Sequence, residues 1–268
     1  MKLFEFVPET TQDCCVTAWL HGNDWDREIV KRKRPAMIIC PGGGYGRICD
    51  KEAEPVAERY FAVGYNTFIL SYSVGEEARN FKPLCQLAST IAHIRKHEDE
   101  FSIYADKIAV SGFSAGGHLT CSIGTLFNEK PFLQVFGRNE DVCPNAIVMG
   151  YPVITADEYA HKGSIENVSG QVLENEEYKW FGLDNHVDIH TPPMFLWHTA
   201  EDMCVPVENS LKMAAALSAK KIPFELHILP NGPHGMSVCT EEVEGKSNYN
   251  GRWVDWSVEW LRHVLKWE

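Results

Sequence analysis

The sequence has no long apolar run and no excess of basic residues. Nowhere does it reach the roughly 20 consecutive apolar residues that a membrane-spanning helix needs. Its 268 residues include 25 Lys and Arg against 37 Asp and Glu, which gives a formal net charge of −12. Because such a surface repels phosphate backbones and anionic lipid, we expect neither a nucleic-acid partner nor a membrane partner.

Paired cysteine motifs are also missing. The nine cysteines fall at irregular spacings without a Cys-x-x-Cys pair, so the sequence predicts no zinc site. Charged and polar residues interrupt Met1–Phe6, so this start lacks the apolar core of a signal peptide. Unpaired thiols are typical of a reducing compartment, and the sequence therefore favours a cytoplasmic protein.

Apolar runs that suit strands alternate with segments of helical periodicity. The predicted strands are 36–40, 67–72, 108–111, 146–150, 194–198 and 224–229, and the predicted helices are 52–63, 84–97, 116–127, 207–219 and 253–267. This alternation is typical of an α/β layer architecture. The length allows a single domain over residues 1–268 with a large core.

The alternation breaks between about Thr155 and His190, where the sequence is polar, acidic and weakly periodic. Long connections between core strands are often functional lids. We interpret 155–190 as a small cap over a site. The alternative is a surface excursion without a catalytic role.

A nucleophile motif follows the predicted strand 108–111. Gly112-Phe113-Ser114-Ala115-Gly116 leads from that strand directly into a helix, which is the context a nucleophile elbow requires. The sharp turn exposes the serine hydroxyl, and the flanking glycines leave room for the neighbouring backbone. We therefore expect Ser114 to be the nucleophile. The alternative is a glycine-rich turn with an idle serine.

A serine hydroxyl needs a base, and the base needs an orienting acid. Along a chain with a nucleophile elbow, the acid is expected after the serine and the histidine after the acid. Asp202 follows the strand 194–198, and His234 follows the strand 224–229 on a loop with flanking glycines. Glu201 competes with Asp202, which is preferred because it leads into Val205-Pro206.

Other histidines are weaker candidates for the base. We expect His118 to be a packing or site-shaping residue and His198 to be a buried, hydrogen-bonded residue. His186 and His190 belong to the predicted cap.

Backbone donors for an oxyanion are expected in the loop Pro41-Gly42-Gly43-Gly44-Tyr45-Gly46, which joins a strand to a helix. Gly43 and Gly44 would donate their N–H groups alongside that of Ala115. A plain flexible turn is one alternative. A phosphate loop is another, but the loop lacks the Gly-Lys-Ser/Thr ending. Tyr45 and Arg47 are predicted to line the acyl or alcohol pocket.

Two further features favour structural interpretations. Trp253, Trp256, Trp260 and Trp267 lie roughly on one face of the last predicted helix, which indicates core packing more than a sugar-binding platform. The basic run Lys31–Arg34 is interpreted as a solvated hairpin turn more than as a nucleic-acid patch.

Four motifs together resemble the carbohydrate-esterase and lipase-like branch of the α/β hydrolases. They are the triple glycine, the Ser114 elbow, Glu201–Pro206 and Pro233-His234-Gly235. That branch includes the hormone-sensitive-lipase type and acetyl xylan esterase-like proteins. The resemblance covers nearly the whole chain, although Pro41 stands where the oxyanion motif usually has His. It implies a mostly parallel sheet with helices on both faces, and ester hydrolysis through an acyl-serine without metal or organic cofactor.

The expected function is therefore hydrolysis of short acyl esters, with acetylated sugars or xylo-oligosaccharides as substrates. One alternative is a serine peptidase of the prolyl-oligopeptidase type, which usually carries a propeller domain for which this chain has no room. Another is a ligand-binding homologue without catalysis, but no triad member is missing. The sequence gives no indication of oligomeric state.

Overall fold

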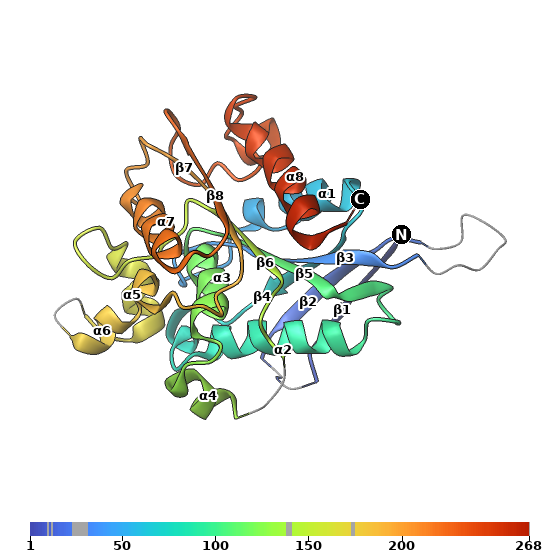
Figure 1. Cartoon of the computed structure of the whole chain (residues 1–268), viewed down its shortest axis with the longest axis horizontal. Coiled ribbons are helices and arrows are strands. Elements are labelled where there is room, and N and C mark those ends of the chain that lie inside the picture. The colour runs from blue at the N-terminus through green and yellow to red at the C-terminus, as the bar shows by residue number, and fades with distance from the viewer. Residues whose placement is uncertain (10, 12, 23–31, 138–140, 173–174, 268) are drawn as a thin grey trace.

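Within residues 1–9, 11, 13–22, 32–137, 141–172 and 175–267, the computed structural model describes an eight-stranded sheet in the order β1-β2-β4-β3-β5-β6-β7-β8 (Figure 1). The strands are β1 Lys2–Phe6, β2 Cys15–Leu20, β3 Arg34–Cys40, β4 Asn66–Ser71, β5 Ile103–Phe113, β6 Ala146–Gly150, β7 Met194–Thr199 and β8 Phe224–Leu229. β3 to β8 run parallel, whereas β1 pairs antiparallel with β2 and β2 with β4.

Helices cover both faces of this sheet (Figure 1). They are α1 Glu54–Ala62, α2 Lys82–Lys96, α3 Ala115–Leu126, α4 Lys130–Phe136, α5 Lys162–Ser169, α6 Glu176–Trp180, α7 Glu208–Lys220 and α8 Trp253–Leu265. α1 and α8 pack on one face, and α2, α3 and α7 pack on the other. The α/β fold with a mostly parallel sheet, predicted from the sequence, is confirmed.

The central strands supply two cores because neighbouring side chains point to opposite faces of a sheet. In β3, Ile38 and Cys40 belong to the core under α2 and α3, whereas Met37 and Ile39 belong to the core under α1 and α8. All four are fully buried, which explains why this strand reads as a continuous apolar run.

The predicted helix 253–267 is α8, and its tryptophans pack as the core-packing interpretation predicts. Trp253 is fully buried and stacks on Trp197 of β7 with ring centroids 5.2 Å apart. Trp260 is also buried, and Trp256 and Trp267 are partly buried against the same core.

The sequence does not predict two N-terminal strands, and it predicts one hairpin that the structure does not contain in the described residues. β1 and β2 went unpredicted because they are short and half-exposed, and their apolar character shows only in alternation. The interpretation of Lys31–Arg34 as a hairpin turn is wrong, because β3 pairs with β4 and β5 and not with the preceding strand β2. Lys31 itself lies outside the described residues. Lys33 forms ion pairs with Glu98 and Asp99.

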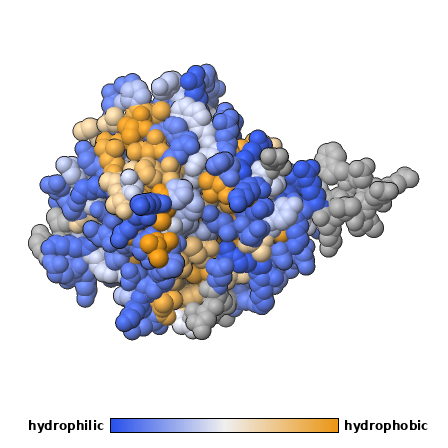
Figure 2. All heavy atoms as spheres, viewed as in Figure 1, coloured by the Kyte–Doolittle hydropathy of each residue, from blue (hydrophilic) through white to orange (hydrophobic). Residues whose placement is uncertain are grey.

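The visible surface is mainly hydrophilic, with apolar residues showing chiefly where Figure 1 places β7, β8 and α7 (Figure 2). The edge strand β8 leaves Phe224 and Ile228 each 37% exposed. None of the helices in the described ranges combines the length and apolar character that a membrane span requires.

Candidate active site

Ser114 forms the turn between β5 and α3. Its backbone lies at φ 52° and ψ −120°, a conformation that L-residues rarely adopt, and the side chain is almost completely buried. A Cβ on Gly112 would lie 2.2 Å from the carbonyl oxygen of Gly116, and a Cβ on Gly116 would lie 2.1 Å from that of Cys40. The flanking glycines are therefore required by close backbone approach, as the motif predicts.

The structure brings Ser114, His234 and Asp202 into one hydrogen-bonded chain. The Nε2 atom of His234 lies 2.9 Å from Oγ of Ser114, and its Nδ1 atom lies 2.6 Å from Oδ2 of Asp202. An ionised carboxylate only accepts, so Nδ1 carries the proton and Nε2 is left to accept from the serine hydroxyl. These contacts join loops that follow three different strands.

Asp202 is held from both of its oxygens. Its Oδ1 accepts hydrogen bonds from the amides of Cys204 and Val205, each at 2.9 Å. Burial alone would raise the pKa of the Asp202 carboxyl, but hydrogen bonds with His198 and His234 outweigh burial and hold that pKa well below its ordinary value. Asp202 is therefore ionised at neutral pH.

The rival acid Glu201 has a different place. Its side chain accepts a hydrogen bond from Asn231 at 2.9 Å at the surface, whereas the side chain of Asp202 meets His234. The preference for Asp202 as the partner of His234 agrees with this geometry.

His198 is the buried, hydrogen-bonded histidine that the sequence predicts, and it also reaches the acid. Its ring is fully buried between Oγ of Ser210, 2.8 Å from Nδ1, and the carbonyl of Val205, 2.9 Å from Nε2. The same Nε2 lies 3.3 Å from Oδ2 of Asp202. This second contact is not predictable from the sequence, because it depends on how the loop after β7 turns back.

The triple-glycine loop takes a left-handed path beside Ser114. The φ angles of Gly43, Gly44 and Tyr45 are 124°, 67° and 58°. A Cβ on Gly43 would lie 2.1 Å from the carbonyl oxygen of Arg47, and a Cβ on Gly42 would lie 2.9 Å from Cβ of Ser114. Among the described residues, the amides of Gly43 and Gly44 donate to no protein acceptor, so both are available to a ligand.

Tyr45 takes a different position from the one we expected. Its side chain is 1% exposed, and its hydroxyl lies 3.0 Å from Nδ1 of His118. The Nε2 atom of His118 donates to the carbonyl of Phe181, so Nδ1 accepts from the tyrosine. Burial lowers the pKa of His118 to about 4 and keeps the ring neutral. We therefore assign Tyr45 to the support of the loop, and His118 to packing as predicted. Arg47 is exposed.

Glu52 and Tyr151 form a buried pair that the sequence does not predict. Glu52, on the short 3-10 turn Asp50–Glu52, accepts hydrogen bonds from the amide of Gly42 and the hydroxyl of Tyr151, each at 2.8 Å. The Tyr151 ring meets the His234 ring edge-on with centroids 4.8 Å apart. The sequence offers no signal for this pair, because Glu52 lies among the charged residues Asp50, Lys51 and Glu54 and reads as part of an exposed helix start.

The predicted cap segment packs onto the glycine loop. The Nδ2 atom of Asn167, in α5, donates to the carbonyl of Gly44 at 2.8 Å. His161 lies nearby with Nδ1 2.8 Å from Oγ of Ser164. Burial lowers the pKa of His161, and the neighbouring His234 lowers it further. Residues 173–174 within the predicted cap lie outside the described ranges, and its role as a cap stays a prediction.

One group among the described residues has the ligand types for a metal ion. Single ligand atoms of Glu9, His93 and His97 lie within 4.8 Å of one another. Lys96 already binds Oε2 of Glu9 at 2.6 Å, and Nδ1 of His93 faces the Glu9 amide at 3.5 Å. These internal contacts occupy the group, which lies outside the Ser114 site.

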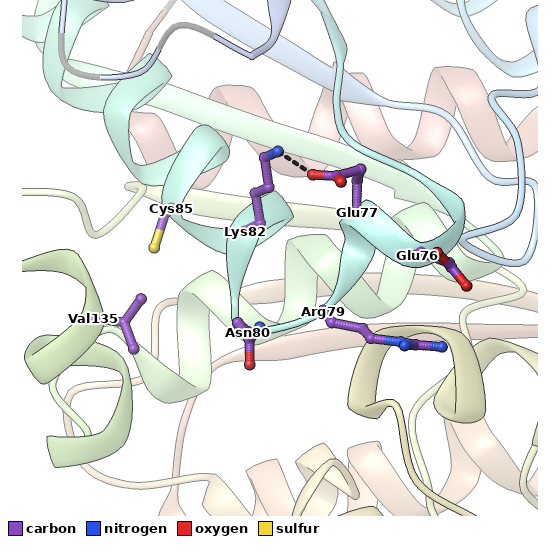
Figure 3. Close-up of a pocket in the computed structure, with 7 residues that line it drawn as sticks. All are labelled: Glu76, Glu77, Arg79, Asn80, Lys82, Cys85 and Val135. Carbon is purple, nitrogen blue, oxygen red and sulfur yellow. Dashed lines mark hydrogen bonds and ion pairs between the residues drawn. The ribbon is translucent and has the colours of Figure 1, made fainter.

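A separate open pocket of about 470 Å³ lies between the start of α2 and α4 (Figure 3). It is lined by Glu76, Glu77, Arg79, Asn80, Lys82, Cys85 and Val135. Lys82 and Glu77 form an ion pair across its wall. Ser114, Asp202 and His234 are not among the residues that line it, so its size alone does not connect it with the Ser114 site.

Comparison with known proteins agrees with this geometry. The sequence model of the BD-FAE family matches residues 26–217. Endo-1,4-beta-xylanase B of Butyrivibrio fibrisolvens is 36% identical over 233 residues, which make up 84% of this chain and 35% of that protein. The acetylxylan esterase of Xylanibacter ruminicola is 28% identical over 76% of this chain and 42% of its own length. The chain thus spans less than half of these curated relatives.

A crystal structure of similar size gives the same fold. The acetyl ester-xyloside bifunctional hydrolase from Caldicellulosiruptor lactoaceticus superposes with a TM-score of 0.81 and 32% identity, over 98% of this chain and 92% of that one. The predicted resemblance to the carbohydrate-esterase branch of the α/β hydrolases is confirmed.

Proposed function

Because this chain belongs to the BD-FAE family, we propose that it is a serine-dependent carboxylic ester hydrolase that removes short acyl groups, with acetylated xylo-oligosaccharides as its substrate class. The observation that carries the proposal is the hydrogen-bonded chain from Ser114 through His234 to Asp202. The substrate class rests on the names of the relatives, an acetylxylan esterase and an acetyl ester-xyloside hydrolase.

In the proposed first half-reaction, Oγ of Ser114 attacks the ester carbonyl while its proton passes to Nε2 of His234. Asp202 stabilises the imidazolium that forms. When the tetrahedral intermediate collapses, the bond to the alcohol oxygen breaks and His234 returns the proton to that oxygen. An acyl-serine ester and a free alcohol result.

In the second half-reaction, water attacks the acyl-serine with His234 again as the base. The intermediate then expels Oγ of Ser114, which regains its proton, and the carboxylic acid leaves. Each step balances with the ester and one water as the only reactants, so the proposal needs neither metal nor organic cofactor.

The negative charge of both intermediates would be stabilised by the amides of Gly43 and Gly44 and by the Ala115 amide at the start of α3. Support for this role comes from the left-handed path of the loop, which leaves the first two amides without a protein acceptor in the described part of the chain. The first turn of α3 adds the positive end of its dipole. We propose that α5 acts as part of a cap, since Asn167 binds the carbonyl of Gly44.

Turnover of p-nitrophenyl acetate by the wild type and by Ser114→Ala tests the reaction. The wild type should hydrolyse the ester and be labelled by a fluorophosphonate, and the variant should do neither. A wild type without turnover or labelling would show that the chain is not a serine hydrolase. Equal turnover in Ser114→Ala would instead refute the nucleophile.

Competition among natural substrates tests the substrate class. Acetate release from acetylated xylo-oligosaccharides should exceed release of acid from triglycerides and cleavage of N-acylated peptides. Preferred cleavage of the peptides would favour the prolyl-oligopeptidase-type alternative.

The cytoplasmic location is also a proposal. It rests on the nine cysteines, all within the described ranges, none of which forms a disulfide. Immunodetection in fractionated cells tests it.

A further inference from the structure

Glu52 is a carboxylate buried next to the reacting groups, and the proposed chemistry does not use it. The residue is 2% exposed. Its Oε2 atom accepts from the Gly42 amide and its Oε1 atom accepts from the Tyr151 hydroxyl, each at 2.8 Å. An ionisable group buried this deeply reduces stability unless it is fully hydrogen-bonded, so its presence here calls for a reason.

The hydrogen-bond directions indicate that Glu52 is ionised. The Gly42 amide can only donate. The Tyr151 oxygen already accepts from the amide of Ser237 at 2.8 Å, so its proton is free to go to Glu52. A proton on Oε1 of Glu52 would make Tyr151 accept twice, and a proton on Oε2 would face the Gly42 amide, which is itself a donor.

Glu52 therefore joins two loops that the reaction needs. Gly42 opens the glycine loop and precedes Gly43. Tyr151, which follows β6 with a strained φ of 36°, touches the His234 ring and holds the Ser237 amide of the loop that carries His234. A second contact ties the same parts together, because Oγ of Ser237 donates to the carbonyl of Lys51 at 2.5 Å.

We propose that Glu52 is a positioning residue, whose carboxylate fixes the glycine loop and the His234 loop relative to Ser114 through Gly42 and Tyr151. This inference rests on the proposed ester hydrolysis. In that reaction the oxyanion donors and the base must hold their positions together, since small displacements of reacting groups reduce rates strongly.

The charge of Glu52 also faces the base. The groups with charge or titration around His234 are Asp202 at its Nδ1 atom, Glu52 behind Tyr151, Lys51 beside Gly235, and His161 from the predicted cap. Burial raises the pKa of Glu52, while the Tyr151 and Gly42 hydrogen bonds oppose that rise. An ionised Glu52 favours the imidazolium that forms when Ser114 attacks.

Three variants separate position from charge. Glu52→Ala removes both links, Glu52→Gln keeps the shape without the charge, and Tyr151→Phe removes the hydroxyl that joins Glu52 to the Ser237 amide. With p-nitrophenyl acetate, we expect each to lower kcat by about 10- to 100-fold with KM within about threefold. In Glu52→Gln the acid limb of the kcat/KM profile should move to lower pH. Tyr60→Phe is the matched control, because it removes a buried hydroxyl that bonds Ser257 away from the site.

Hydrogen exchange read by mass spectrometry tests the links without any turnover. In Glu52→Ala and Tyr151→Phe, peptides covering 42–47 and 234–239 should exchange faster than in the wild type, whereas in Tyr60→Phe they should not. Hydrogen exchange can be measured even if the wild type hydrolyses no ester. Failure of the proposed ester hydrolysis is therefore distinguishable from failure of the positioning role of Glu52.

Thermal unfolding followed by circular dichroism shows whether each variant is folded. If Glu52→Ala does not fold, Glu52→Gln and Tyr151→Phe decide the question together. Folded variants with wild-type kcat and an unchanged pH profile would overturn the positioning role. Unchanged exchange in both loops would overturn the link itself.

Discussion

The carboxylate of Asp202 meets a second histidine, since Nε2 of His198 lies 3.3 Å from its Oδ2 atom. This contact helps to hold the oxygen that faces His234. We expect His198→Ala to destabilise the fold by about 2–4 kcal/mol, because it empties a buried position and leaves the Val205 carbonyl without its donor. We also expect a fall in kcat. Urea unfolding and turnover measure both effects, with His190→Ala as the exposed control, and unchanged values would contradict the role of this contact.

Asp202→Asn should lower kcat by about 10³- to 10⁴-fold, since an amide at this position favours the wrong His234 tautomer. Stability supplies a second test. Because the pKa of Asp202 is depressed in the fold, its carboxylate stabilises the protein above the unfolded pKa of about 3.9, and this contribution is lost as the pH falls toward the lower folded value. The difference in unfolding free energy between wild type and variant should therefore shrink from pH 6 to pH 3.

Glu52 should show the opposite dependence on pH. Its pKa is raised by burial, so its contribution to stability is greatest below the unfolded pKa of about 4.3 and is lost as the pH rises through the folded value. Relative to Glu52→Gln, which does not titrate there, the wild type should lose stability as the pH rises from about 4. Denaturant titrations across that range measure the slope, and a rise with pH would contradict the assignment.

Tyr45→Phe tests the place of this tyrosine. The change leaves Nδ1 of His118 buried without a donor, and we expect a loss of about 1–3 kcal/mol in the free energy of unfolding. Because the hydroxyl is buried, KM should change little. A several-fold rise in KM without loss of stability would instead restore Tyr45 as a substrate contact.

Gly43→Ala should disable the loop that faces Ser114. The new Cβ would lie 2.1 Å from the Arg47 carbonyl at a φ of 124°, so the loop must move and its amide with it. A loss of about 10²- to 10³-fold in kcat follows from removing one oxyanion donor. Gly163→Ala in α5, where no atom lies within 4 Å of the added Cβ, is the matched control. Wild-type turnover in Gly43→Ala would contradict the oxyanion assignment.

Much of this architecture follows from the sequence alone. Parallel strands buried on both faces have apolar side chains on both faces. The buried parts of β3 and β5 to β7 can therefore be recognised in the sequence as short apolar runs between helical segments. Ser114, Asp202 and His234 could be found because each follows such a strand, and strand ends meet at one edge of a parallel sheet. Glycines at positions that need a left-handed backbone or a close backbone approach can also be recognised, because the requirement is set by the local turn.

Other features depend on the tertiary structure. The edge strands β1 and β2 are half-exposed and become strands only by pairing with β4. Tyr45 looked like a pocket residue from its position in the chain, but the fold turns its side chain inward to His118. Glu52 bonds Tyr151, which is 99 residues away in the sequence, and His198 meets Asp202, which is four residues away, because the loop after β7 turns back. Packing determines the hydrogen-bond partners of buried polar groups, which is why the sequence could predict Ser114, Asp202 and His234 as site residues while only the fold shows what holds them.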